Sequence, residues 1–112
     1  MSIKADVENL IIQLDYPLND STKKQLEDIA NNTNEFFSFA GHIFSLKDDL
    51  KRIDGTVAMS NSNNYLKIKS NSKIDLELAE FNEIANAWAQ KYKVELKKVD
   101  NKNTYYIIGK NS

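Results

Sequence analysis

An apolar stripe with helical spacing between residues 26 and 53 constrains the fold of this chain more than any other feature. Apolar or small side chains recur there every three or four residues, which is the spacing of one face of an α-helix. The positions are Leu26, Ile29, Thr33, Phe36, Ala40, Ile43, Leu46, Leu50 and Ile53. Phe37, Phe39 and Phe44 flank the stripe and widen its apolar surface in the middle. A helix this apolar needs cover from more than one direction.

The stripe predicts one long helix over residues 21–53, capped at its start by Asp20 or Ser21. Residues 31–34 read Asn-Asn-Thr-Asn and are poor helix formers, and Asn32 with Glu35 resembles the capping box of a new helix. Because the apolar phase continues through this cluster, we expect a continuous helix that bends there. Its length would be roughly 50 Å, which exceeds the width of a domain of this size.

A shorter helix is predicted before the long one. Ile3, Val7, Leu10, Ile11 and Leu14 share one helical face, and Ser2 is a suitable N-cap. The helix must end near Asp15, because Pro17 disfavours helical backbone in the residue before it.

The hydrophobic period changes after residue 54. Residues 57–59 and 65–69 alternate between apolar and polar side chains around a turn-forming Ser-Asn-Ser-Asn-Asn segment, which predicts a β-hairpin. A second hairpin is predicted from residues 94–99 and 104–108. Between the hairpins, one more helical face is formed by Ile74, Leu78, Phe81, Ala85, Trp88 and Tyr92.

These elements predict an α+β fold. The 112 residues have the length of a single domain, with a helical part at 1–54 and a ββαββ part at 55–112. We expect the two hairpins to pair into one antiparallel sheet with a helix on one face.

The composition excludes several classes of site. There is no cysteine, so disulfides and thiolate chemistry are ruled out, and three glycines are too few for a phosphate-binding glycine loop. Lys and Arg total 15 against 16 Asp and Glu, which gives no support for a globally basic surface. Arg52 is the only arginine, a bias typical of AT-rich coding sequences such as those of low-GC bacteria and their phages.

The titratable residues do not form a recognisable catalytic or metal-binding pattern. His42 is the only histidine, so a zinc site would need carboxylates for its other ligands. Asp48 and Asp49 diverge by about 100° on a helix, while Glu77, Glu80 and Glu83 form an exposed ridge. We therefore expect no catalytic, cofactor-binding or metal site and no enzymatic activity.

The first functional hypothesis is a small cytoplasmic protein-interaction domain of the inhibitor, immunity, antitoxin or adaptor type. Its long amphipathic helix would associate with a protein partner or with a second copy, as a homodimer. The candidate interface residues are Phe36, Phe37, Phe39, Ile43, Phe44 and Leu50. No apolar run is long enough to cross a membrane, so we expect no membrane partner.

The alternative hypothesis is a nucleic-acid-binding accessory protein. The C-terminal half carries lysines interleaved with tyrosines on its predicted strands, and a sheet face of this kind can stack single-stranded bases. The candidate contacts are Tyr65, Lys67, Lys69, Lys97 and Tyr105. Because Tyr105 and Tyr106 are adjacent in a strand, one of them must point away from the core.

Overall fold

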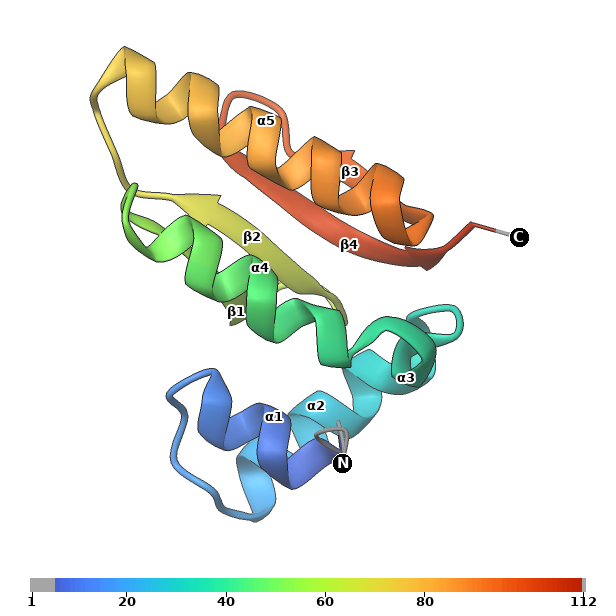
Figure 1. Ribbon diagram of the computed structural model, residues 1–112. Coiled ribbons are helices and arrows are strands. Elements are labelled where there is room, and N and C mark those ends of the chain that lie inside the picture. The colour runs from blue at the N-terminus through green and yellow to red at the C-terminus, as the bar shows by residue number, and fades with distance from the viewer. Residues whose placement is uncertain (1–5, 112) are drawn as a thin grey trace.

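Along the part of the chain that the structure describes, four helices are followed by a ββαββ unit, as the sequence pattern predicts for the C-terminal part (Figure 1). The computed structural model describes residues 6–111. The elements are α1 (Val7–Gln13), α2 (Asp20–Asn32), α3 (Phe36–Phe39), α4 (Gly41–Lys51), β1 (Gly55–Met59), β2 (Leu66–Ser70), α5 (Asp75–Tyr92), β3 (Val94–Lys98) and β4 (Thr104–Lys110). The predicted α+β class is confirmed. None of the described helices is both long enough and apolar enough to cross a membrane.

The two hairpins form one four-stranded antiparallel sheet with the strand order β1-β2-β4-β3. The hairpins therefore meet at their second strands, and β2 and β4 occupy the centre. Val57 lies opposite Ile68, which lies opposite Tyr105, so these three side chains share one face. Register shifts between Glu95 and Leu96, where a β-bulge interrupts the β3–β4 pairing. The predicted pairing of the hairpins is confirmed.

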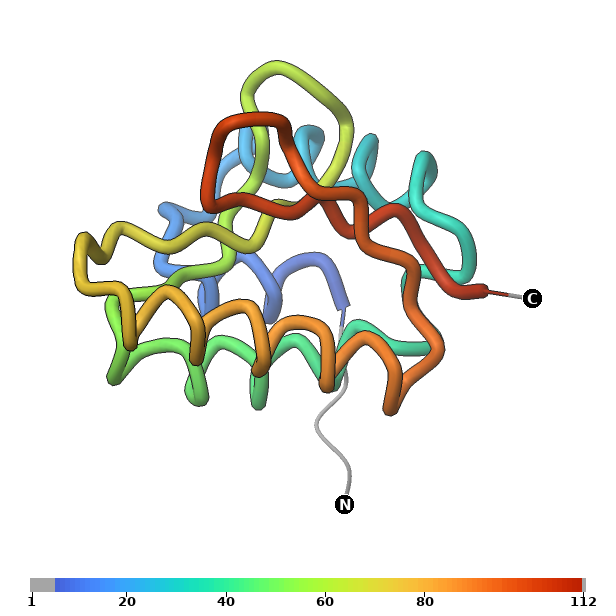
Figure 2. The backbone as a smooth tube through the Cα atoms, turned by 90° about the horizontal axis from the view of Figure 1, so that it is seen from above, coloured from blue at the N-terminus to red at the C-terminus, as the bar shows by residue number. Residues whose placement is uncertain are grey.

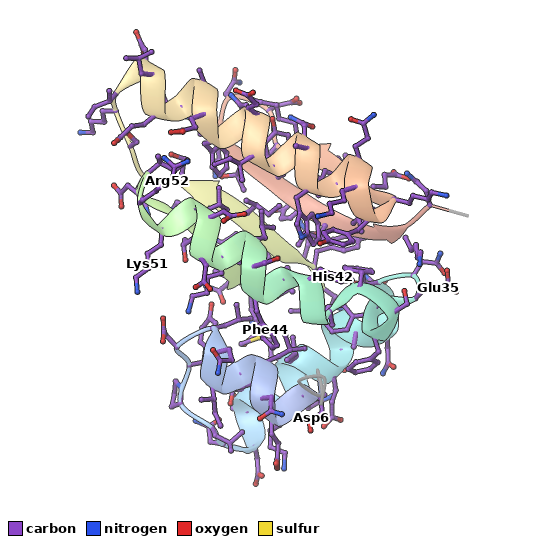
Figure 3. All side chains as sticks on the ribbon, in the orientation of Figure 1. Asp6, Glu35, His42, Phe44, Lys51 and Arg52 are labelled. Carbon is purple, nitrogen blue, oxygen red and sulfur yellow. The ribbon has the colours of Figure 1, made fainter. Side chains whose placement is uncertain are left out.

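Helices α4 and α5 lie side by side on one face of this sheet (Figures 1 and 2). That face and the helix surfaces facing it supply most of the core. The buried side chains include Ile43, Leu46, Leu50, Val57, Leu66, Ile68, Phe81, Ala85, Trp88 and Ile107. Arg52 at the end of α4 makes a two-pronged ion pair with Glu80 of α5, with N–O distances of 3.1 and 2.9 Å (Figure 3).

Helices α1 and α2 pack against each other and lie beside β1 (Figure 1). The hydroxyl of Tyr16 accepts a hydrogen bond of 3.0 Å from the backbone N–H of Met59, and the amide of Gln25 donates to the carbonyl of Ser60. The connector between the two helices thus satisfies a backbone donor of an edge strand, which would otherwise be free to pair with another chain.

Both predicted starts of these helices differ from the structure. The N-cap of α1 is Asp6, whose carboxylate accepts from the N–H of Asn9 at 2.8 Å; the predicted cap Ser2 lies outside the described residues. The N-cap of α2 is Asn19 rather than Asp20 or Ser21, because Asn19 and Thr22 bond each other's backbone N–H in a reciprocal capping box.

The expectation of one continuous helix over residues 21–53 is wrong. Helix α2 ends at Asn32, and Thr33 is extended, with φ −111° and ψ 116°. The hydroxyl of Thr33 donates to the carbonyl of Ile29 at 2.7 Å, which satisfies one carbonyl of the last turn. Glu35 then adopts a left-handed conformation, with φ 50°, and α3 begins at Phe36.

The end of β4 accounts for this break. The carbonyl of Asn34 accepts from the N–H of Lys110 at 2.9 Å, and the side-chain amide of Asn34 donates to the carbonyl of Lys110 at 2.9 Å. Asn34 also forms a short parallel bridge with Gly109. Backbone groups that a continuous helix would pair internally are paired here with a strand far along the chain. The predicted bend is therefore a complete change of direction.

Gly109 tests this account of the break. Its φ of +143° strains any L side chain, and a Cβ there would lie 2.5 Å from the backbone nitrogen of Asn34. We expect Gly109→Ala to lower the free energy of unfolding by about 2 kcal/mol or more, measured by urea denaturation. Gly41→Ala, at an exposed position of α4, is the matched control and should lose no stability, because alanine is the better helix former. Equal midpoints for Gly109→Ala and the parent chain would contradict the account.

Candidate functional site

Most of the predicted protein-interface residues lie in the chain's own core. The exposed fractions of Phe36, Phe39, Ile43 and Leu50 are 2, 1, 0 and 0%. Phe44 is partly buried and lies between α4 and α1 (Figure 3). Phe37 is the exception, with 54% of its surface exposed. The wide apolar arc is thus covered by α1, α5 and the sheet, and Phe37 is the member of the set that a partner could reach.

The face of the sheet opposite α4 and α5, which we call the outer face, carries lysines on β2 and β3. Lys67 is half-buried, whereas Lys69 and Lys97 are exposed. Tyr106 of β4 lies opposite Lys67 on one side and Lys97 on the other, so the three side chains form one row across neighbouring strands. Three of the five predicted nucleic-acid contacts, Lys67, Lys69 and Lys97, therefore share this face, and a fourth, Tyr65, lies at its end.

The predicted contact Tyr105 does not lie on the outer face. It is 7% exposed, its hydroxyl donates to Asn82 of α5 at 2.7 Å, and its ring lies 6.0 Å from that of Phe81. Alternation along β4 then turns the neighbouring Tyr106 outward. Tyr105 therefore faces the core, and Tyr106 is the tyrosine of β4 on the outer face.

Tyr65 and Tyr106 form an aromatic pair at the end of the outer face. Their ring centroids are 5.9 Å apart and the rings are inclined by 35°. The side-chain amide of Asn63 donates to the hydroxyl of Tyr106 at 3.1 Å, which fixes the ring against the β1–β2 loop. Both rings are half-buried, so each combines a packed edge with a solvent-facing surface.

An open concavity of about 280 Å³ lies beside this pair, between the tips of the two hairpins. Its lining includes Ser60 and Ser62 from the first loop, Lys102 from the second, and Lys67, Lys69 and Tyr106 from the sheet. No carboxylate lines it, and the described ion pairs leave these lysines without an acidic partner. Ammonium and hydroxyl groups arranged in this way can hold an anion, such as a phosphate group.

The hydroxyl of Tyr106 is unusually acidic. Hydrogen bonds from Ser62, Asn63 and Ser60, together with the charge of Lys67, lower the pKa of Tyr106 from 10.0 to about 8. Each of these groups stabilises the phenolate over the phenol. Above pH 8 the concavity therefore gains a negative charge, which opposes anion binding.

Three other titratable candidates, Glu77, Glu80 and His42, have structural partners. Glu77 accepts a 2.6 Å hydrogen bond from the hydroxyl of Ser72, and Glu80 is held by Arg52. His42 is exposed and stacks on Tyr92. Within residues 6–111, no three histidine, aspartate or glutamate side chains come close enough together to hold a metal ion.

Comparison with known proteins adds no functional information: no family model, curated protein or solved structure matches this chain.

The pKa of Tyr106 is directly measurable. We expect one phenolate to appear in the near-ultraviolet absorbance with a midpoint near pH 8, and Tyr106→Phe to remove that step. Ser62→Ala should raise the pKa of Tyr106 toward 10.0, because the largest stabilising hydrogen bond is lost. A titration in which the native chain and Tyr106→Phe give the same curve at pH 8 would refute the assignment.

Proposed function

We propose that this chain binds single-stranded nucleic acid on the outer face of its sheet. The observation that carries the proposal is the Tyr65–Tyr106 ring pair set among lysines that have no acidic partner in the described chain. This is the alternative hypothesis of the sequence analysis, with Tyr106 in place of Tyr105. The chain would bind without performing catalysis.

The two kinds of side chain on this face have complementary roles. Aromatic rings offer flat surfaces on which bases stack, and this contact tolerates any base. Lysine ammonium groups neutralise backbone phosphates and release condensed counterions. Since neighbouring strands lie about 4.8 Å apart, the row of Lys67, Tyr106 and Lys97 spans two strand spacings and places a ring between two positive charges.

The chemistry favours single strands without strong sequence preference. Bases inside a duplex are already stacked and cannot reach the tyrosine rings. Bidentate reading of guanine is chiefly the work of arginine, and the single arginine of the chain is bound to Glu80. Affinity would therefore come from stacking and from phosphate neutralisation, so it should be sensitive to salt.

A salt series tests the proposal. We expect a fluorescent single-stranded oligonucleotide to bind more tightly than the matching duplex, with affinity that falls as salt is added. Each lost phosphate contact reduces the slope of log affinity against log salt by about 0.7. The double variant Lys67→Gln, Lys69→Gln should therefore reduce it by about 1.4, as measured by fluorescence anisotropy.

The matched control is Lys23→Gln, Lys24→Gln on α2, where both lysines already have acidic partners in Glu8 and Asp28. This variant loses the same formal charge but should keep the parent's slope. If both double variants lost the same amount of slope, the effect would come from net charge and not from the outer face. Absence of binding at low salt would contradict the proposal.

Association through α3 is a second candidate, supported by the exposure of Phe37. This phenylalanine is 54% exposed although its neighbours Phe36 and Phe39 are buried. It contacts Phe36 edge-on, with ring centroids 5.2 Å apart. A stable interface buries about 800 Å² on each partner, far more than one ring supplies, so association would need further surface around Phe37.

Light scattering tests this candidate. If Phe37 anchors a homodimer, the native chain should show twice the monomer mass at high micromolar concentration, and Phe37→Ser should be monomeric. Leu76→Ser is the control, since Leu76 is 83% exposed at the start of α5, and it should leave the mass unchanged. A native chain that stays monomeric would exclude self-association.

A further inference from the structure

A second basic pocket lies on the helical side of the molecule, away from the outer face. It has a volume of about 300 Å³ and is lined by Ser38 of α3, His42 of α4, Lys91 and Tyr92 of α5, the following Lys93, and Lys110 of β4. We call it the His42 pocket, after the histidine labelled in Figure 3. We propose that the His42 pocket binds a phosphate group, either as inorganic phosphate or as a phosphomonoester.

One wall of the pocket is a fixed aromatic stack. The imidazole of His42 lies 3.8 Å from the ring of Tyr92, centroid to centroid, with only 12° between the planes. The indole N–H of Trp88 donates to the carbonyl of His42 at 2.9 Å, and the rings of Trp88 and Tyr92 are 5.9 Å apart. These contacts hold the backbone and the ring of His42, so the imidazole does not need to be ordered by a ligand.

The lysines around this wall come from separate segments whose backbones are also held. Lys93 adopts a left-handed conformation, with φ 57°, and its carbonyl accepts from the N–H of Asn111 at 2.7 Å. Lys110 is bonded at both backbone groups to Asn34. Lys91 places its ammonium 5.4 Å from the centre of the Tyr92 ring. The backbone positions of these three lysines thus surround the same pocket.

The charge of the pocket is not balanced by the protein. No aspartate or glutamate lines it, and the described ion pairs involve none of its lysines. The negative end of the α5 dipole explains a cation at Lys91, but it does not explain Lys110, which arrives from β4. Like charges gathered around a concave space repel one another, and a bound anion would relieve that repulsion.

The donor set indicates phosphate rather than a carboxylate. Lysine acts on phosphate as a point charge, whereas planar carboxylates are matched best by the fork of arginine. The pocket offers lysines, an imidazole and the hydroxyl of Ser38, all able to donate to oxygens that point in different directions. Since water occupies about 30 Å³ per molecule, the pocket has room for a phosphate and part of the group that carries it.

The chain contains its own probes for a test. It has one histidine and one tryptophan, so the imidazole NMR signals and the indole fluorescence both report on this pocket without assignment. Titrating inorganic phosphate into the untagged chain at constant ionic strength should shift the His42 signals along a saturable curve. Phenyl phosphate is the second ligand: tighter binding than phosphate would identify an ester as the preferred form, and equal binding would identify the free ion.

The variant Lys93→Asn, Lys110→Gln should raise the apparent dissociation constant about tenfold or more, since charge-assisted hydrogen bonds are lost. Asparagine is chosen at position 93 because it tolerates the left-handed backbone. The control Lys67→Ala, Lys69→Ala removes two outer-face lysines. It should leave the phosphate-induced shifts of the His42 signals unchanged. A linear, non-saturable shift, or equal weakening by both variants, would overturn the proposal and leave the outer-face proposal untouched.

Discussion

The pairing of Asn34 with the end of β4 determines how the rest of the chain is arranged. It stops α2, turns the backbone through Thr33 and Glu35, and starts α3 and α4 in a new direction. Helix α4 can then lie beside α5 on one face of the sheet (Figure 2). Because both helices use that face for the core, the lysines and tyrosines of the opposite face are left to solvent. The proposed binding surface therefore depends on where the long apolar segment is interrupted.

Much of the fold could be predicted because its signals are local. In each hairpin, two strands with alternating polar and apolar residues are joined by a short polar loop, and the two strands pair with each other. The break at 33–35 could not be predicted in the same way. Ile29, Phe36 and Ile43 are all buried, so the apolar phase is the same on both sides of the interruption. The groups that cause the break, Asn34 and Gly109, are far apart in sequence and meet only in the folded chain.

The candidate site was predictable in part for a related reason. Alternation in β2 places Lys67 and Lys69 together, and Leu66 and Ile68 show which side is buried. In β4 the apolar residues Ile107 and Ile108 are adjacent, so alternation alone cannot show whether Tyr105 or Tyr106 faces outward. Pairing across the sheet decides it, since Ile107 lies opposite the buried Leu66. The stack of His42 on Tyr92 joins α4 and α5, and no periodicity or motif in the sequence predicts it.

The core and the proposed single-strand surface lie on opposite faces of one sheet. Backbone amide NMR shifts, followed during titration with a short single-stranded oligonucleotide, show which face binds. The largest changes should fall in β2, β4 and β3 and in the loop that carries Asn63 and Tyr65. Changes concentrated on α3 and α4, or no changes at low salt, would rule out binding on the outer face.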